Sequence, residues 1–426
     1  MEPLEKFSYI PKVERRYDLD WLRIIAIVLV FFYHCSRFFD EEVWHIKNNV
    51  ESAFLKGGMS FGYAFILPLF FVISGMGTFY ALNYVSAGKY TLTRSNRLMI
   101  PFIIGIFTHI PLQVFLEAKL PPHNYPGNFF QFYTQELFQG IYMITEDGVF
   151  PVLGHHLWFL VILFIYSLIL IGPFVLLRRE KTYKRLLNMT SFLAKPGIIF
   201  TLVIPVILLE QINNSIGAVL PYIGGYSFYT YIIFIFFGFV IASNKNFKES
   251  IEKQIIPTLC VVVITAIALI VFYVFKYDAL FDPEYVIEGI NYMKTIYWII
   301  FPIYGWSFVI LLLGLGSKFM NKNSKARKFL NELVMPFYVL HQTIIIIVGY
   351  FVIKIPTSSM IAKYIIITSS SLTIIICLLF IIKYLNPLRV LFGMRWKKGL
   401  LRRKPTVEVT SKSVDLSETK EGKIGK

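Results

Sequence analysis

Residues 17–39, YDLDWLRIIAIVLVFFYHCSRFF, form an apolar run that is long enough to cross a bilayer and yet contains an arginine and a histidine. Arg23 and His34 are eleven positions apart, about three helical turns, so both side chains are expected on one helix face, roughly 16 Å apart along the axis. Ionisable groups in a membrane span are costly and usually face a protein interior or a water-filled cavity. The stretch therefore predicts a membrane helix that carries a functional site.

The composition indicates a polytopic membrane protein. Of the 426 residues, 56% are hydrophobic and 16% are charged, whereas soluble chains average about 25% charged residues. The formal net charge of +16 would suggest nucleic acid in a soluble chain, but its distribution over the loops matters more here, and we expect no nucleic-acid partner. Cys35, Cys260 and Cys377 lie in apolar runs, which predicts packing roles rather than disulfides.

Runs of spanning length predict an all-α protein with about ten transmembrane helices. The runs lie near residues 19–39, 63–84, 98–117, 156–177, 197–212, 226–243, 256–276, 296–316, 331–351 and 361–385. The fifth run is the weakest, because it is short and contains Pro205.

The loop charges predict that both termini are cytoplasmic. With the N-terminus inside, most of the 42 lysines and arginines fall in inner segments, as the positive-inside tendency requires. We therefore expect a cytoplasmic segment at 1–18, a transmembrane domain at 19–385, and a basic and then disordered cytoplasmic tail at 386–426, in a multi-pass protein of a plasma membrane.

Two further segments combine polar and apolar features. FFVISG, at 70–75, contains Ser74 and Gly75, a pair typical of close helix packing. RSNRLMIP, at 94–101, places Arg94 and Arg97 on one helix face, a fork suited to phosphate groups. Ordinary anchoring is the alternative for these arginines, and snorkelling towards the interface is the alternative for Arg23.

These segments in this order resemble the acyltransferase 3 family of integral membrane acyltransferases, which we expect in bacteria. The family's arginine, ten residues and histidine are matched by Arg23 and His34, and its RxxR motif by Arg94 and Arg97. GHHLWFL, at 154–160, is similar to the glucan biosynthesis protein C-like branch, and PFYVLHQ, at 336–342, to a late histidine motif of the family. One departure is Trp21, which stands where the family typically has a glycine after the aspartate.

The resemblance implies a membrane-bound O-acyltransferase that moves an acetyl, succinyl or similar group from acyl-CoA to a hydroxyl of a glycan or other cell-envelope acceptor. His34 would act as general base or covalent acyl carrier, assisted by Arg23, while Arg94 and Arg97 would hold the donor's phosphates. Acyl-CoA would be a substrate, with no permanently bound cofactor. His341 is a candidate second proton carrier or acceptor-orienting group.

Simpler interpretations remain open for several residues. His156 and Trp158 are candidate acceptor-binding residues, yet His156 could be interfacial and Trp158 could belong to an interfacial aromatic belt. His341 could be a satisfied core residue. His109, Glu117 and Glu210 are further polar groups at membrane depth. For Glu210 a packing hydrogen bond is the expected role, with substrate contact as the alternative. No metal-ligand spacing such as HExxH occurs, so we expect no metal.

The long outer loop at 119–155 is rich in aromatic residues, among them Phe132 and Phe138. This predicts an amphipathic piece on the membrane surface, with a sugar-stacking platform as the alternative. Two other functions stay open for the whole chain. One is a transporter or flippase of an envelope precursor, and the other is a non-catalytic membrane scaffold. The oligomeric state cannot be read from the sequence.

Overall fold

Long apolar helices set the architecture, because backbone polar groups in hydrocarbon must be paired within their own segment. The computed structural model describes residues 14–136, 154–215, 222–276, 286–287, 290–356 and 359–397. Within these ranges, eight helices are long and apolar enough to cross a membrane, and the number rises to ten if two sharply bent helix pairs each count as one span. The predicted all-α polytopic fold is confirmed.

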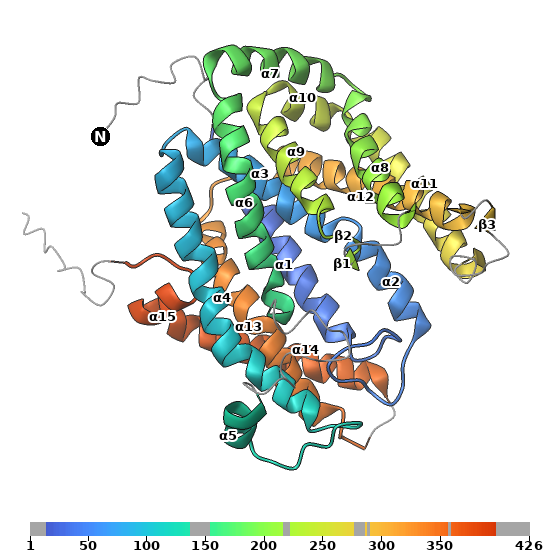
Figure 1. The fold of residues 1–426 in the computed structure, drawn as a ribbon, viewed down its shortest axis with the longest axis vertical. Coiled ribbons are helices and arrows are strands. Elements are labelled where there is room, and N and C mark those ends of the chain that lie inside the picture. Colours follow the sequence, from blue (N-terminus) through green and yellow to red (C-terminus); the bar gives the residue numbers. More distant parts are fainter. Residues whose placement is uncertain are drawn as a thin grey trace, which may run out of the picture. The chain divides into compact units, whose positions relative to one another are not determined.

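The long helices that pack around the first span are shown in Figure 1. In chain order the α-helices are α1 (Asp18–Ser36), α2 (Ala53–Tyr63), α3 (Ile66–Leu82), α4 (Ala87–Ala118), α5 (Phe129–Gln131), α6 (Trp158–Leu177), α7 (Glu180–Leu193), α8 (Ile204–Ser215), α9 (Thr230–Ser243), α10 (Asn246–Lys253), α11 (Ile255–Lys276), α12 (Tyr292–Leu315), α13 (Lys325–Val352), α14 (Met360–Tyr384) and α15 (Asn386–Leu391). Short 3-10 or π turns are η2 (Phe132–Glu136), η4 (His155–Leu157), η5 (Ile198–Val203) and η8 (Gly316–Met320).

Strands are confined to two small hairpins in the described ranges. One pairs β1 (Tyr222–Ile223) with β2 (Tyr226–Ser227), with Tyr222 opposite Ser227, and the other pairs β3 (Val286–Ile287) with β4 (Ile290–Asn291). Both are antiparallel and lie in connections between helices.

The fifth and sixth predicted spans differ most from expectation. The helical stretch Ile198–Asn214 is short and bends by 111° from α7, and α9 bends by 102° from α10. The predicted start of the third span at residue 98 is wrong, because α4 already begins at Ala87. Arg94 and Arg97 therefore lie inside a long helix rather than at its entry.

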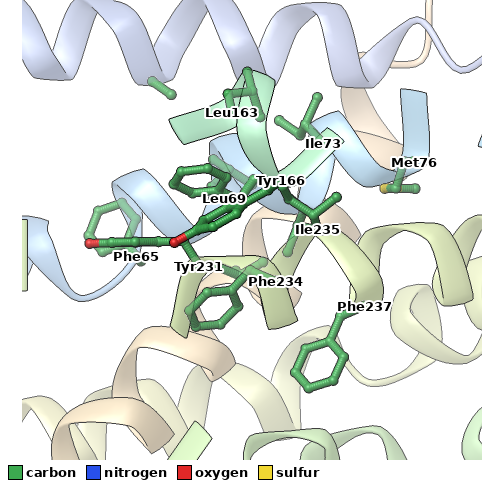
Figure 2. Packing of buried hydrophobic residues seen from close by; sticks show 14 of the residues in the cluster. Phe65, Leu69, Ile73, Met76, Leu163, Tyr166, Tyr231, Phe234, Ile235 and Phe237 are labelled. Atoms are coloured by element: carbon green, nitrogen blue, oxygen red, sulfur yellow. The ribbon is translucent and has the colours of Figure 1, made fainter. Parts of the chain in front are cut away.

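Close backbone contact joins α3 to α9. A Cβ atom on Gly75 would lie 1.9 Å from the carbonyl oxygen of Ile235, and one on Gly238 would lie 2.0 Å from that of Val72. Around this contact, aromatic and aliphatic side chains of α3, α6 and α9 fill the core, as Figure 2 shows for Leu69 and Tyr231. The packing role expected for Gly75 is confirmed.

The first span lies among other helices rather than at the lipid boundary alone. α1 packs against both α3 and α13, while α4 packs against α6 and α13 (Figure 1). Val28, Leu29 and Phe32 form its exposed apolar face. The opposite face of α1 is the one that positions the site.

Replacing Gly238 with alanine should destabilise the helix pair, because the new methyl group overlaps the α3 backbone, and overpacking of this kind costs about 1–3 kcal/mol. We expect a lower melting temperature for the purified protein in detergent. Gly77→Ala, in α3, is the matched control, since its Cβ would meet nothing within 4 Å. Equal melting temperatures for the two variants would contradict the close contact.

Candidate active site

One cavity of about 1400 Å³ runs along the inner face of α1. Arg23, Ile27, Val30 and His34 line it, at helical spacings of three and four residues that place them on one face. The shared face predicted for Arg23 and His34 is therefore confirmed. Both residues border the same open space, and His34 faces protein and cavity rather than lipid.

Of the two ring nitrogens of His34, Nδ1 has hydrogen-bond partners and Nε2 has none among the described residues. Its Nδ1 lies 3.0 Å from the Val30 carbonyl oxygen and 3.2 Å from Nε2 of His341. His341 Nδ1 lies 2.5 Å from the Tyr338 carbonyl oxygen, which can only accept, so this nitrogen carries the proton. In the neutral ring His341 Nε2 then accepts, and His34 Nδ1 donates. The Nε2 lone pair of His34 is left free at the cavity wall.

His341 lies behind His34 as seen from the cavity. It is fully buried on α13 and stacks on the ring of Phe337, with the centroids 6.3 Å apart and an interplanar angle of 8°. It is absent from the cavity wall, which His34 does line. The position suits a residue that orients His34 better than one that touches an acceptor.

His156 and Trp158 both line the cavity on the side of α6. His156 Nε2 donates to the Val339 carbonyl oxygen at 3.1 Å, and its Nδ1 is buried without a hydrogen-bond partner. Trp158 is only 8% exposed and contacts the ring of Tyr231. The interfacial-belt interpretation of Trp158 is therefore wrong, because the ring is enclosed by neighbouring helices.

The turn before α6 is unusual. Gly154 and His155 have positive φ angles of 79° and 44°. A positive φ is uncommon for a residue other than glycine, and such conformations cluster at functional sites. The turn presents His155 and His156 in succession to the cavity.

Arginines gather where the cavity meets the N-terminal half of α1. Arg94 Nε donates to Ser167 Oγ at 2.6 Å, and another guanidinium nitrogen donates to Ser74 Oγ. Ser74 thus binds the RxxR motif instead of only packing against a helix. Arg97 is exposed at the cavity wall and interacts electrostatically with Arg23, Arg94 and Arg395. Like charges this close together favour an anionic ligand.

Asp20 holds part of this cluster in place. Its carboxylate pairs with Arg327, which is 2% exposed, and lies 3.6 Å from Arg23. Arg23 also donates to Asn331 Oδ1 at 3.2 Å. Two side chains, one on α1 and one on α13, therefore hold the guanidinium of Arg23 at the cavity wall, which argues against simple snorkelling.

The other end of the cavity contains groups that the sequence analysis did not assign to the site. Arg37 is buried and donates to Asp40 at 2.5 Å and to Glu42 at 2.8 Å. Burial would lower the pKa of Arg37, but Tyr33, Tyr63 and these carboxylates raise it above its ordinary value. The side chain therefore stays a cation.

Another histidine, His45, lies nearby. His45 Nε2 is 3.2 Å from Gln342 Nε2, an amide donor, so His45 Nδ1 carries the proton that bonds Glu117 Oε2 at 2.6 Å. The separations of 297 and 72 residues explain why no local motif indicated these contacts. Two features of the sequence pointed towards this end of the cavity: Tyr33 is next to His34, and Glu117 is a carboxylate at membrane depth.

The remaining polar candidates lie away from this chemistry. Glu210 is buried and accepts hydrogen bonds from Ser227 and Thr230, at 2.6–3.0 Å, which confirms its packing role. His109 bonds Thr108 at 2.7 Å and contacts Phe392. Across the described ranges, no group of three or more histidine, cysteine or acidic side chains could hold a metal ion.

Of the outer loop, the structure describes residues 119–136 and 154–155. Phe132 is fully buried against Phe115 and Tyr125, so this residue does not lie on the membrane surface as predicted. Its neighbour Phe130 is 78% exposed. Phe138 falls outside the described residues, as does the part of the predicted 386–426 tail from residue 398 on.

Comparison with known proteins identifies the family. A family model described as an acyltransferase domain, that of acyltransferase 3, matches residues 16–381. The chain belongs to the acyltransferase 3 family. The matched region includes the whole of α1, the RxxR motif and the late histidine on α13.

Curated relatives are similar over a shorter stretch. The glucans biosynthesis protein C of Salmonella heidelberg is 25% identical over 190 residues, which are 44% of this chain and 46% of that protein. The protein of the same name from Salmonella typhi has the same values, and that from Salmonella paratyphi B is 26% identical over 173 residues, 40% of this chain and 42% of that protein. The chain thus spans about half the length of the curated relatives it matches. No solved structure matches it.

Cysteine labelling can test which face of α1 borders the cavity. In a background with the three native cysteines replaced by serine, a charged thiol reagent should modify Val30→Cys, which lines the cavity. Val28→Cys is the matched control, because Val28 is 40% exposed on the outer, lipid-facing side, where the reagent has no water to travel through. If the reagent labelled the Val28→Cys variant and left the Val30→Cys variant unmodified, the result would contradict the position of the cavity on the Val30 face of α1.

Proposed function

We propose that this protein transfers an acyl group from acyl-CoA to a hydroxyl of a glycan or other cell-envelope acceptor. The observation that carries the proposal is that one cavity contains both an arginine cluster and the open Nε2 of His34. Phosphate recognition and hydroxyl activation are the two tasks of such a transfer. Membership of the acyltransferase 3 family supports the reaction class.

The donor binds with its phosphates at Arg94 and Arg97. Ser74 and Ser167 hold Arg94 in position, and Arg23 lies further along the cavity wall. Arg23 and His34 are roughly 16 Å apart along α1, a distance comparable to an extended pantetheine arm. The thioester therefore reaches His34 while the nucleotide stays at the arginines, on the side that the loop charges predict to be cytoplasmic.

His34 Nε2 takes the proton of the acceptor hydroxyl as its oxygen attacks the thioester carbonyl. The C–S bond breaks, and the proton passes from His34 to the leaving thiolate. His341 keeps Nδ1 of His34 protonated and thereby directs the lone pair of Nε2 into the cavity. The same nitrogen serves in a covalent route, in which His34 carries the acyl group before the acceptor receives it.

The acceptor enters from the opposite end of the cavity, lined by Trp44, His45 and Glu117. His156 and Trp158 form part of the wall along its path. The name of the Salmonella relatives favours a glucan as acceptor, and their organism favours a bacterial origin. A succinyl or acetyl group fits the same scheme, and no resident cofactor is required.

A flippase for an envelope precursor is the alternative, since a cavity along a membrane helix also suits a translocation path. The two functions differ in their products. Mass spectrometry of envelope glycans from cells with and without this protein should reveal an added acyl mass. Unmodified glycans that nonetheless change sides of the membrane would support the flippase.

His34→Ala should abolish acyl transfer, because the variant loses the base that faces the thioester. The measurement is transfer from labelled acyl-CoA in proteoliposomes, normalised to the amount of folded protein in the membrane. His109→Ala is the matched control, as this histidine is absent from the cavity wall. Full transfer by the His34 variant would refute the assignment.

Replacing Arg94 and Arg97 together with glutamine should raise the apparent KM for acyl-CoA about tenfold or more and change kcat less, because the lost contacts bind the donor's phosphates. The control pair is Lys181→Gln with Lys184→Gln on the exposed surface of α7, which removes the same charge elsewhere. An unchanged donor KM in the arginine variant would assign Arg94 and Arg97 to membrane anchoring.

A further inference from the structure

Two tyrosines beside His34 form a hydrogen-bonded pair that the scheme above does not use. The hydroxyl groups of Tyr33, on α1, and Tyr63, at the end of α2, bond each other, and both residues line the cavity. The ring of Tyr33 meets that of His34 edge to face, with the centroids 4.8 Å apart. The pair therefore borders the space in which His34 meets its substrates.

A pair of phenols has one proton more than its mutual bond uses. Each hydroxyl is both donor and acceptor, so one O–H donates within the pair and the second O–H has no acceptor among the described residues. Both residues are half-buried at the cavity wall, where this O–H can reach a molecule in the cavity. An acceptor oxygen supplied by a bound substrate would complete the pair.

One cation, Arg37, lies next to the tyrosine pair and is itself paired with two carboxylates. The guanidinium of Arg37 lies 5.9 Å from the centroid of the Tyr33 ring and interacts electrostatically with both phenols. Asp40, Glu42 and the Val43 carbonyl hold Arg37 in place. The guanidinium is therefore fixed behind the phenols, and the one free O–H of the pair is the donor that an anion in the cavity meets.

Tyr63 is itself held firmly. The turn of the β1–β2 hairpin packs on it so closely that a Cβ on Gly225 would lie 2.8 Å from Cβ of Tyr63. Tyr226 of the same hairpin donates to the Ala64 carbonyl oxygen at 3.0 Å. Donors that are fixed before the substrate binds need no reorganisation during the reaction.

We propose that the Tyr33–Tyr63 pair is the oxyanion hole of the acyl transfer, an inference that rests on the proposed function. When the acceptor oxygen bonds to the thioester carbon, the C=O electrons move onto the carbonyl oxygen, and the free phenol O–H donates to it. The acceptor's proton goes to Nε2 of His34. When the carbonyl re-forms, the C–S bond breaks and the thiolate takes this proton, so the phenols end as they began.

The test compares Tyr33→Phe, Tyr63→Phe and the double variant, which keep the rings and remove only the hydroxyls. Loss of one oxyanion donor typically lowers kcat by about 10²–10³. We expect a loss of this size in the double variant, with the donor KM within about threefold of wild type and an unchanged melting temperature. Each single variant should lose less, because the remaining phenol can turn its O–H towards the substrate.

Tyr350→Phe is the matched control, since this residue lies on α13 and is absent from the cavity wall. Replacement of Tyr63 by 3-fluorotyrosine, a more acidic phenol and stronger donor, should retain kcat or raise it. A purely structural clasp between α1 and α2 would lower the melting temperature of the double variant instead.

Two results separate the proposals. A double variant that keeps wild-type kcat, or loses it only in step with its melting temperature, overturns the oxyanion hole and leaves the acyltransferase intact. A wild-type protein that transfers no acyl group from acyl-CoA overturns the proposed function and this inference with it.

Discussion

The site depends on a chain of hydrogen bonds that fixes one proton on each of two imidazoles, the buried His341 and His34 at the cavity wall. It begins at the carbonyl of Tyr338 on α13, passes through His341 and ends at Nδ1 of His34 on α1. In a low-dielectric interior an unpaired polar group is costly, so each bond in such a chain strongly selects the tautomer of the next ring. The consequence is that the only free lone pair of the two rings lies at the cavity wall.

The arginine cluster has an excess of positive charge. Several guanidinium groups at one end of a membrane cavity repel one another, and the described carboxylates there, such as Asp20, already serve Arg327 and Arg23. Serine hydroxyls on α3 and α6 orient Arg94 but do not neutralise it. In the proposed function, the phosphates of the donor supply the negative charge that this end of the cavity lacks.

Much of the fold followed from the sequence because membrane helices are local objects. Apolar length located every long helix, and the helical period alone placed Arg23 and His34 on one face. The two bent pairs were harder. Apolar length predicted spans at 197–212 and 226–243, but the sharp bends of these segments relative to α7 and α10 depend on tertiary packing.

The site was only partly predictable. His34 and His341 were both singled out, but their contact joins residues 307 positions apart and arises from the packing of α1 on α13. The sequence predicted an ordinary loop cation for Arg37 and an interfacial ring for Trp158. Both side chains are buried, and burial depends on tertiary packing that the local sequence does not show. Tyr63 and His45 carry no motif at all. Their roles depend on which segments the fold brings to the cavity.

The most direct test of the account is a cryo-electron microscopy structure with a non-hydrolysable thioether analogue of acyl-CoA. The account predicts phosphates at Arg94 and Arg97 and a sulfur within about 4 Å of Nε2 of His34, the range of a near-attack arrangement. A nucleotide bound elsewhere, or a pantetheine arm that never enters the cavity along α1, would contradict it.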